Sequence, residues 1–108
     1  MTFEEIFQLA KNLLSKADIS KINGKLAFQF NITGEGAGTF YLEVKDGQLN
    51  IEPYDYKDRD AEFTASFDVL KKLASGQLDS ITAFTLGMLK VNGNITKALE
   101  LKKMLKHK

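Results

Sequence analysis

Hydrophobic and polar residues follow two different periods along this chain, and the changes between them predict its elements. Apolar residues recur at helical spacing over residues 3–17, behind a capping box in which Thr2 is the N-cap and Glu5 the third helical residue. Over residues 26–33, apolar and polar residues alternate instead, which is the period of a half-buried strand. The pattern therefore predicts an N-terminal helix followed by a strand.

A second alternation, over residues 39–45, ends at Asp46-Gly47, a dipeptide typical of a two-residue hairpin turn. Such a turn sets the register of the next strand, so the prediction can be checked within the sequence. The predicted pairs are Lys45 with Gln48, Val44 with Leu49, Glu43 with Asn50, and Leu42 with Ile51. Apolar residues then meet on one face and polar residues on the other, as a half-buried hairpin requires.

The second half of the chain changes period more often. In order, the pattern predicts a polar loop over 52–60, a fourth strand over 61–67, a helix that Gly76 ends, a short helix over 79–86, a strand over 88–92 and a last helix capped by Asn94. Residues 83–94 switch from helix to strand to helix and are mostly apolar, so we expect them to pass through the core.

The order of the predicted elements is helix, three-strand meander, strand, two helices, strand, helix. Strands that come early and helices that come late are typical of an α+β fold. We therefore predict a five-stranded, mostly antiparallel sheet covered by helices.

Composition narrows the class of protein. The chain has 108 residues, which suits one domain, and 44% of them are apolar, including eight phenylalanines. A net charge of +1 argues against a nucleic-acid partner, and the absence of cysteine excludes disulfides and thiolate metal sites. With no long apolar run, an acidic N-terminus and no Ser-Lys-Leu ending, we expect a cytoplasmic location.

Sites for catalysis, cofactors or metals are weakly supported. The glycines of residues 34–38 lead into Thr39 and a strand, whereas a dinucleotide loop needs a further glycine and a helix, so a hairpin loop is favoured. The acidic residues of 55–62 lack the mid-loop glycine and late glutamate of a calcium-binding EF-hand. His107 is the sole histidine, which rules out a triad or zinc site built on histidines. We predict no enzyme, no cofactor and no metal.

Two further sets of residues allow two interpretations each. The first is a surplus of phenylalanines on predicted inward faces, which indicates either an ordinary core or the wall of a cavity for an apolar ligand: Phe28, Phe30, Phe40, Phe63, Phe67 and Phe84. The second is the lysines of the last helix, which form either a solvated face or a weakly attractive surface for anionic lipid: Lys97, Lys102, Lys103, Lys106 and Lys108.

Several segments, taken in order, resemble the sterol carrier protein 2-like (SCP2-like) family. They are residues 28–34, residues 38–44 with Asp46-Gly47, Asp60-Ala61, residues 73–76, and residues 83–94 with Ala98 and Leu101. The resemblance covers nearly the whole chain. It implies a five-stranded sheet covered by helices, a hydrophobic cavity between them, and binding of sterols, fatty acids, fatty acyl-CoA or phospholipids without an enzymatic step.

Two positions depart from the family pattern. Members often have a polar residue in place of Leu86 and a lysine in place of Met88. Both positions are apolar here, which puts a polar head-group contact at this spot in doubt and favours a more apolar ligand.

We therefore expect non-enzymatic binding, with transfer, of lipid-like molecules such as fatty acids, fatty acyl-CoA and sterol-like or isoprenoid molecules. The alternative is an accessory module that presents a hydrophobic substrate to a partner enzyme of lipid or quinone metabolism. The predicted cavity wall consists of Phe30, Ile32, Phe40, Leu42, Phe63, Ile81, Phe84, Leu86, Met88 and Ile95. The natural ligand and the oligomeric state stay open at this point.

Overall fold

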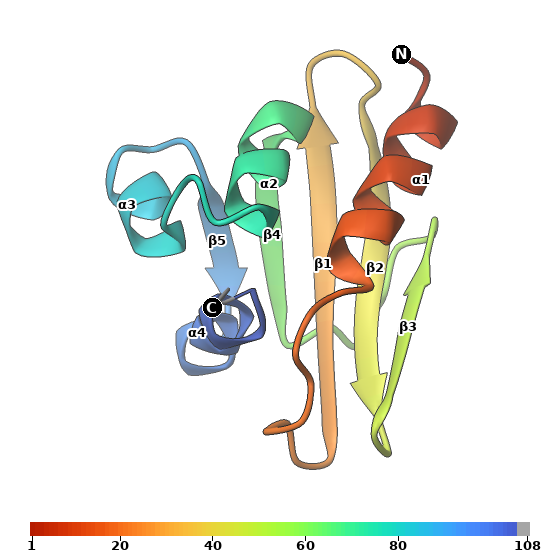
Figure 1. Ribbon diagram of the computed structural model, residues 1–108, viewed down its shortest axis with the longest axis vertical. Coiled ribbons are helices and arrows are strands. Elements are labelled where there is room, and N and C mark those ends of the chain that lie inside the picture. Colours follow the sequence, from red (N-terminus) through yellow and green to blue (C-terminus); the bar gives the residue numbers. More distant parts are fainter. Residues whose placement is uncertain (106–108) are drawn as a thin grey trace.

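A computed structural model of the chain describes residues 1–105, and Figure 1 shows a sheet with helices packed beside it. Lys106, His107 and Lys108 lie outside the described residues. The elements are α1 (Phe3–Leu14), β1 (Lys25–Thr33), β2 (Gly38–Lys45), β3 (Gln48–Glu52), β4 (Ala61–Ser66), α2 (Phe67–Ala74), α3 (Ser80–Thr85), β5 (Lys90–Gly93) and α4 (Ile95–Met104). This order and the α+β class confirm the prediction.

The five strands form one sheet in the order β3-β2-β1-β4-β5. The central strand β1 is antiparallel to β2 and parallel to β4, where Phe30 lies opposite Phe63. The β2–β3 and β4–β5 pairs are antiparallel, so the sheet is mostly antiparallel, as predicted. The one parallel pair arises because the chain leaves β3, crosses the sheet and adds β4 on the other side of β1.

The β2–β3 hairpin has the predicted register. Lys45 pairs with Gln48 and Leu42 with Ile51, and the two intermediate pairs also match. Asp46 and Gly47 both have positive φ angles, 52° and 77°, as the mirror-image turn of a two-residue hairpin requires. The sequence pattern alone was sufficient here because the turn is local and fixes the pairing.

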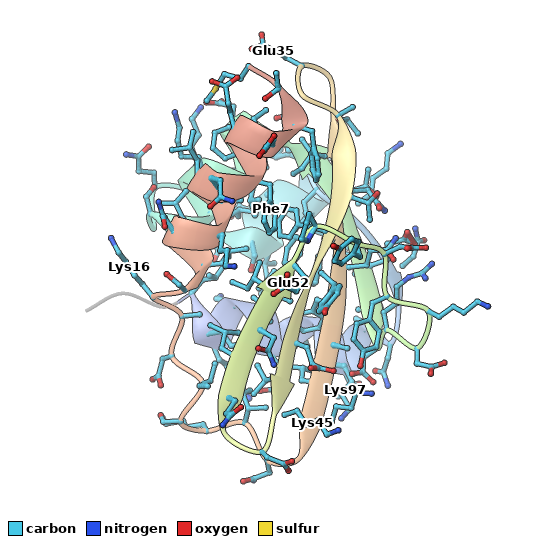
Figure 2. The ribbon with its side chains drawn as sticks, turned by 90° about the vertical axis from the view of Figure 1, so that its right-hand side faces the viewer. Phe7, Lys16, Glu35, Lys45, Glu52 and Lys97 are labelled. Carbon is cyan, nitrogen blue, oxygen red and sulfur yellow. The ribbon has the colours of Figure 1, made fainter. Side chains whose placement is uncertain are left out.

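The helices and the β3–β4 connection lie on opposite faces of the sheet, as the side view in Figure 2 shows. Phe7 of α1 points toward the sheet, and its ring centroid lies 5.7 Å from that of Phe40. On the other face, the Tyr56 backbone N–H donates to the Gln29 side-chain oxygen at 3.0 Å, and the Tyr56 hydroxyl donates to Glu43. Burial of Gln29, on a face predicted to be solvated, follows from this covering loop.

Phenylalanine rings form the centre of the core. Phe30 stacks between Phe40, at a centroid distance of 5.0 Å, and Phe63, at 5.3 Å. Phe28 meets Phe63 edge to face at 5.1 Å. All four are buried, as predicted, whereas Phe67 is only partly buried. These contacts fill the space between sheet and helices along β1 and β2.

The first helix is shorter than predicted. Its capping box between Thr2 and Glu5 is present, but the helix ends at Leu14 and not at Ala17. The chain turns there because the Ala17 N–H donates back to the Leu14 carbonyl, and the Asp18 N–H donates to the Met104 carbonyl at the end of α4. A long-range bond of this kind has no signature in the local pattern.

The prediction that residues 83–94 pass through the core is wrong for most of this stretch. Ala83 and Leu89 are buried, but Phe84 is 51% exposed and Leu86 66% exposed. Gly87 ends α3 in a Schellman motif, in which the Met88 N–H donates to the Ala83 carbonyl at 2.9 Å. The strand then starts at Lys90, two residues later than predicted, and lies at the edge of the sheet. An edge position leaves one side of this segment without a covering element.

Candidate ligand-binding site

A groove between α3 and α4, at the β5 edge of the sheet, has a volume of about 200 Å³. We call it the α3–α4 groove. Its lining is apolar except for one serine and consists of Phe63, Ser80, Ile81, Phe84, Leu89, Val91, Ile95, Ala98, Leu99 and Leu101. A surface of this composition offers burial and almost no hydrogen bonds, which suits hydrocarbon.

The groove has a buried floor and an open rim. Phe63, Leu89 and Leu101 on the floor belong to the hydrophobic core. The rim residues are about half exposed, namely Ile81 (47%), Phe84 (51%), Ile95 (53%) and Leu99 (48%). Full burial of such a side chain contributes about 1.5–3 kcal/mol, so covering each half-exposed one would contribute about 1 kcal/mol. The groove is therefore an incomplete piece of core that an apolar molecule can complete.

The wall made by α4 is placed by a close approach of two backbone segments. Gly93 has a φ of 100°, and a Cβ there would lie 2.8 Å from the carbonyl oxygen of Asp60. The Asn94 N–H donates to the same carbonyl at 2.9 Å, and the Asn94 side chain caps α4 by accepting from the Lys97 N–H at 3.1 Å. Only glycine permits this approach, so Gly93-Asn94 fixes where α4 starts relative to β4.

The predicted wall residues fall into three groups. Phe63, Ile81, Phe84 and Ile95 line the α3–α4 groove. Phe30 and Ile32 line a deeper hollow of about 10 Å³, which shares Phe63, Leu89 and Leu101 with the groove. Phe40 and Leu42 are fully buried in the core, and Leu86 and Met88 are exposed beside the groove; these four line none of the hollows described here.

Sequence reasoning missed six lining residues: Ser80, Leu89, Val91, Ala98, Leu99 and Leu101. Five of them carried a usable signal. On the last helix, Ala98 and Leu99 follow Ile95 at helical spacing and Leu101 follows Ala98. Leu89 and Val91 also alternate along the predicted last strand. Phe84 was placed correctly on α3 but assigned to the interior, whereas it lies on the rim.

An ion pair joins α3 to α4 at one end of the groove. Lys102 Nζ lies 3.1 Å from Asp79 Oδ1, while Asp79 Oδ2 caps α3 by accepting from the backbone N–H groups of Ile81 and Thr82, each at 3.1 Å. The hydrogen bond from Thr82, followed by that from Lys102, holds the pKa of the Asp79 carboxyl below its ordinary value of 3.8. Asp79 is therefore charged at neutral pH.

A second hollow adjoins this ion pair, and we call it the Lys102 hollow. It is lined by Leu73, Gly76, Leu78, Asp79, Ser80, Lys102, Lys103 and Leu105. Ser80 lines both this hollow and the α3–α4 groove, so the two are neighbours.

The glycines of residues 34–38 and the acidic residues of 55–62, considered above as possible dinucleotide and calcium sites, have structural explanations. A Cβ at Gly38 would lie 2.4 Å from the Phe3 ring, and one at Gly36 would lie 2.2 Å from Ile6, so these glycines let α1 pack closely on the loop. In the acidic segment, Asp60 accepts from the Ala27 N–H at 2.8 Å. Within residues 1–105, no group of three or more His, Cys, Asp or Glu side chains is arranged to hold a metal ion.

Comparison with known proteins identifies the family. The family model described as the SCP-2 sterol transfer family matches residues 3–106. The chain belongs to this family, which confirms the resemblance noted in the sequence. None of the helices described for residues 1–105 is both long enough and apolar enough to span a membrane.

A curated relative agrees with this assignment. Hydroxysteroid dehydrogenase-like protein 2 of Bos taurus is 37% identical over 105 residues, which cover 94% of this chain but 24% of that protein. The chain thus spans about a quarter of that relative's length.

Among solved structures, apo sterol carrier protein 2 of Yarrowia lipolytica has a TM-score of 0.63 and 26% identity, over 96% of this chain and 86% of the other. Sterol carrier protein 2 of Aedes aegypti, in complex with palmitate, has a TM-score of 0.66 and 20% identity, over 97% and 94% of the two chains. The second likeness concerns the fold alone.

Proposed function

We propose that this domain binds lipid-like molecules in the α3–α4 groove and transfers them in the cytoplasm, without a chemical step. The proposed ligands are fatty acids, fatty acyl-CoA and sterol-like or isoprenoid molecules, which share a long apolar body. The observation that carries this proposal is the rim of half-exposed apolar side chains above a buried apolar floor. Membership of the SCP-2 sterol transfer family and the palmitate complex of the Aedes aegypti protein support it.

The energetics of such a groove favour broad specificity. Each buried methylene contributes about 0.8 kcal/mol, so a sixteen-carbon chain gains on the order of 10 kcal/mol before ordering costs. Burial does not distinguish one hydrocarbon from another. Ligand pockets usually have volumes of about 300–1,000 Å³. At about 200 Å³, the groove has to widen for a long chain, and we expect α3, a helix of six residues, to move outward.

The test is a titration with a fluorescent fatty acid, supported by native mass spectrometry of the freshly purified protein. Phe84→Asp places a charge on the groove rim. We expect the dissociation constant of this variant for the fluorescent fatty acid to rise at least about tenfold, because the ligand must then desolvate a carboxylate. Leu86→Asp is the matched control, since Leu86 is exposed on the same segment but lies outside the groove, and we expect wild-type binding.

Two results would contradict the proposal. One is the absence of both saturable binding and co-purified lipid in the wild-type protein. The other is equal binding by the Phe84→Asp and Leu86→Asp variants, which would place the ligand elsewhere. Both variants should stay folded, because substitutions at half-exposed positions usually change the free energy of unfolding by less than about 1 kcal/mol.

A second candidate function is an accessory module that presents a hydrophobic substrate to a partner enzyme. The observation that favours it is that the region matching this chain forms about a quarter of a longer dehydrogenase-like protein. A carrier should deliver fluorescent fatty acid to lipid vesicles as an isolated protein. A module should bind the ligand, fail to deliver it to vesicles, and co-purify with one enzyme.

We also propose a transient contact with anionic membranes through the lysines of α4. Lys102 and Lys103 are exposed and Lys97 is partly buried, and each lysine near an anionic surface contributes about 1 kcal/mol. Lys106 and Lys108 lie outside the described residues. Delivery should therefore be faster to vesicles that contain phosphatidylserine than to neutral ones, and added salt should remove the difference; equal rates would contradict this contact.

A further inference from the structure

The polar residues at the end of the α3–α4 groove are arranged as a continuation of it. Ser80 lines both the groove and the Lys102 hollow, and the Asp79–Lys102 ion pair lies at this junction. The hollow has an apolar part, made by Leu73 of α2, Leu78 of the α2–α3 connection and Leu105 just after α4, and a charged part, made by Asp79, Lys102 and Lys103. An extended molecule that leaves the groove past Ser80 therefore meets the Asp79–Lys102 ion pair.

The position of Lys102 on α4 explains how its amine reaches this junction. Residues three and four apart on a helix share a face, so Lys102 follows Leu99 and Ala98, which both line the groove. The same face thus presents apolar side chains along the groove and an ammonium group at its end. Lys97, on the same helix, lines a different hollow with Lys21, Asn23 and Lys25.

The two carboxylate oxygens of Asp79 have separate partners. Oδ2 accepts from the N–H groups of Ile81 and Thr82 and from the Thr82 hydroxyl, at 3.1, 3.1 and 3.4 Å. Oδ1 pairs with Lys102. Loss of the Lys102 contact therefore leaves the cap of α3 in place. Because the Asp79 side chain is 42% exposed, water can solvate Oδ1 once the pair opens.

The charges around the junction define what can bind there. Lys103 lies 3.4 Å from Glu100, and Lys102 lies 3.1 Å from Asp79, so these four side chains carry no net charge. A polyanionic group would need more than one cation without a partner. A single carboxylate can instead take the place of the Asp79 carboxylate on Lys102, which exchanges one group for another of the same chemistry.

We propose that Lys102 binds the carboxylate of a long-chain fatty acid whose chain lies in the α3–α4 groove. In the absence of ligand, Asp79 forms an ion pair with Lys102, and the fatty acid carboxylate displaces it. The inference rests on the proposed function and adds to it a head-group site and a preference for the acid over the neutral alcohol. Displacement of Asp79 also breaks the ion pair that joins α3 to α4, so ligand binding itself would free α3 to move outward.

The experiment compares hexadecanoate with hexadecanol, each displacing a neutral fluorescent probe from the full chain. Lys102→Met should weaken hexadecanoate binding about fivefold and leave hexadecanol within about twofold of wild type, as expected for loss of one partly exposed charge contact. Lys97→Met, the matched control on the same helix, should change neither ligand. Asp79→Asn keeps a good N-cap residue and removes the competing charge, so it should tighten hexadecanoate about threefold and leave hexadecanol unchanged.

The ratio of the two affinities separates the head-group site from a merely structural ion pair. If Lys102 only holds α3 against α4, both ligands change together in Lys102→Met and the ratio stays at its wild-type value, which would overturn the proposal. The same holds if Lys102→Met and Lys97→Met behave alike. In either case, if the wild-type protein still binds hexadecanol, the proposed function stands and only the head-group site is refuted. A wild-type protein that binds neither ligand would refute the proposed function itself.

Discussion

The two halves of the sheet use the same kind of side chain in different ways. Along β1 and β2, phenylalanines stack on one another beneath α1, a helix of 12 residues, and Phe40 is fully buried. At the β5 edge, α3 has six residues and β5 has four, and the large apolar side chains there are about half exposed. We refer to these regions as the closed half and the open half.

Apolar composition alone therefore does not show whether a side chain completes the core or stays partly open to solvent. In the closed half, a covering helix completes the burial, so the side chains contribute to folding. In the open half, short elements at a sheet edge leave the burial incomplete. The free energy that remains unused there is available to a ligand, which is how a small domain can bind hydrocarbon without polar contacts.

The largest effect that separates the halves is expected at Phe40. Truncation of a buried phenylalanine to alanine typically costs about 3–5 kcal/mol, since it removes apolar contacts and leaves a cavity. Phe40→Ala should therefore lower the free energy of unfolding by that amount in a urea titration. A loss below about 1 kcal/mol would mean that the closed half is loosely packed.

A smaller loss of stability is expected at Gly38. A Cβ there would lie 2.4 Å from the Phe3 ring, so Gly38→Ala must displace α1 or distort the loop. Overpacking of this kind costs about 1–3 kcal/mol. The same urea titration measures it, and restoration of stability by the additional change Phe3→Ala would identify the ring as the cause. An unchanged midpoint in Gly38→Ala would contradict the close packing.

In the open half, truncation should reduce binding more than stability. Leu99→Ala removes a half-exposed rim residue, so the free energy of unfolding should fall by less than about 1 kcal/mol, while the affinity for hexadecanol should fall about threefold to tenfold. Leu9→Ala is the control, because Leu9 is similarly exposed on α1. Equal affinities in the two variants would remove the distinction between the halves.

The smallest effect concerns the pH dependence of α3. The pKa of Asp79 lies below 3.8 in the folded protein, so its charged form contributes stability above pH 3.8, which is lost as the pH falls through the folded pKa. The difference in unfolding free energy between wild type and Asp79→Ala should therefore be constant from pH 7 to about pH 5 and shrink below pH 3.8. A difference that grows on acidification would contradict this assignment.

Much of the closed half could be predicted from the sequence, because its signals are local. The turn at Asp46-Gly47 fixes the register of β2 and β3, and Thr2 with Glu5 marks the start of α1. The β1–β4 pairing is different, since it depends on a crossover between segments about 33 residues apart, such as Phe30 and Phe63, and no local pattern specifies it.

The open half was predicted less well for a physical reason. Periodicity shows which side chains share a face, but it does not show whether another element covers that face. Phe84 and Leu86 were therefore assigned to the interior although they lie at an edge, while Ala98, Leu99 and Leu101 on α4 were not assigned to the site. The reason for glycine at position 93 also appears only in the structure, where the close approach of the Asp60 carbonyl leaves no room for a side chain.

The central claim, that the open half binds the hydrocarbon chain, can be tested most directly by methyl NMR with a spin-labelled fatty acid. The label should broaden the methyl resonances of Ile81, Ile95 and Leu99 and leave those of Leu42 and Val44 in the closed half sharp. Broadening of Leu42 and Val44, or of Leu9 and Leu13 on α1, with Ile81, Ile95 and Leu99 unaffected, would contradict the account.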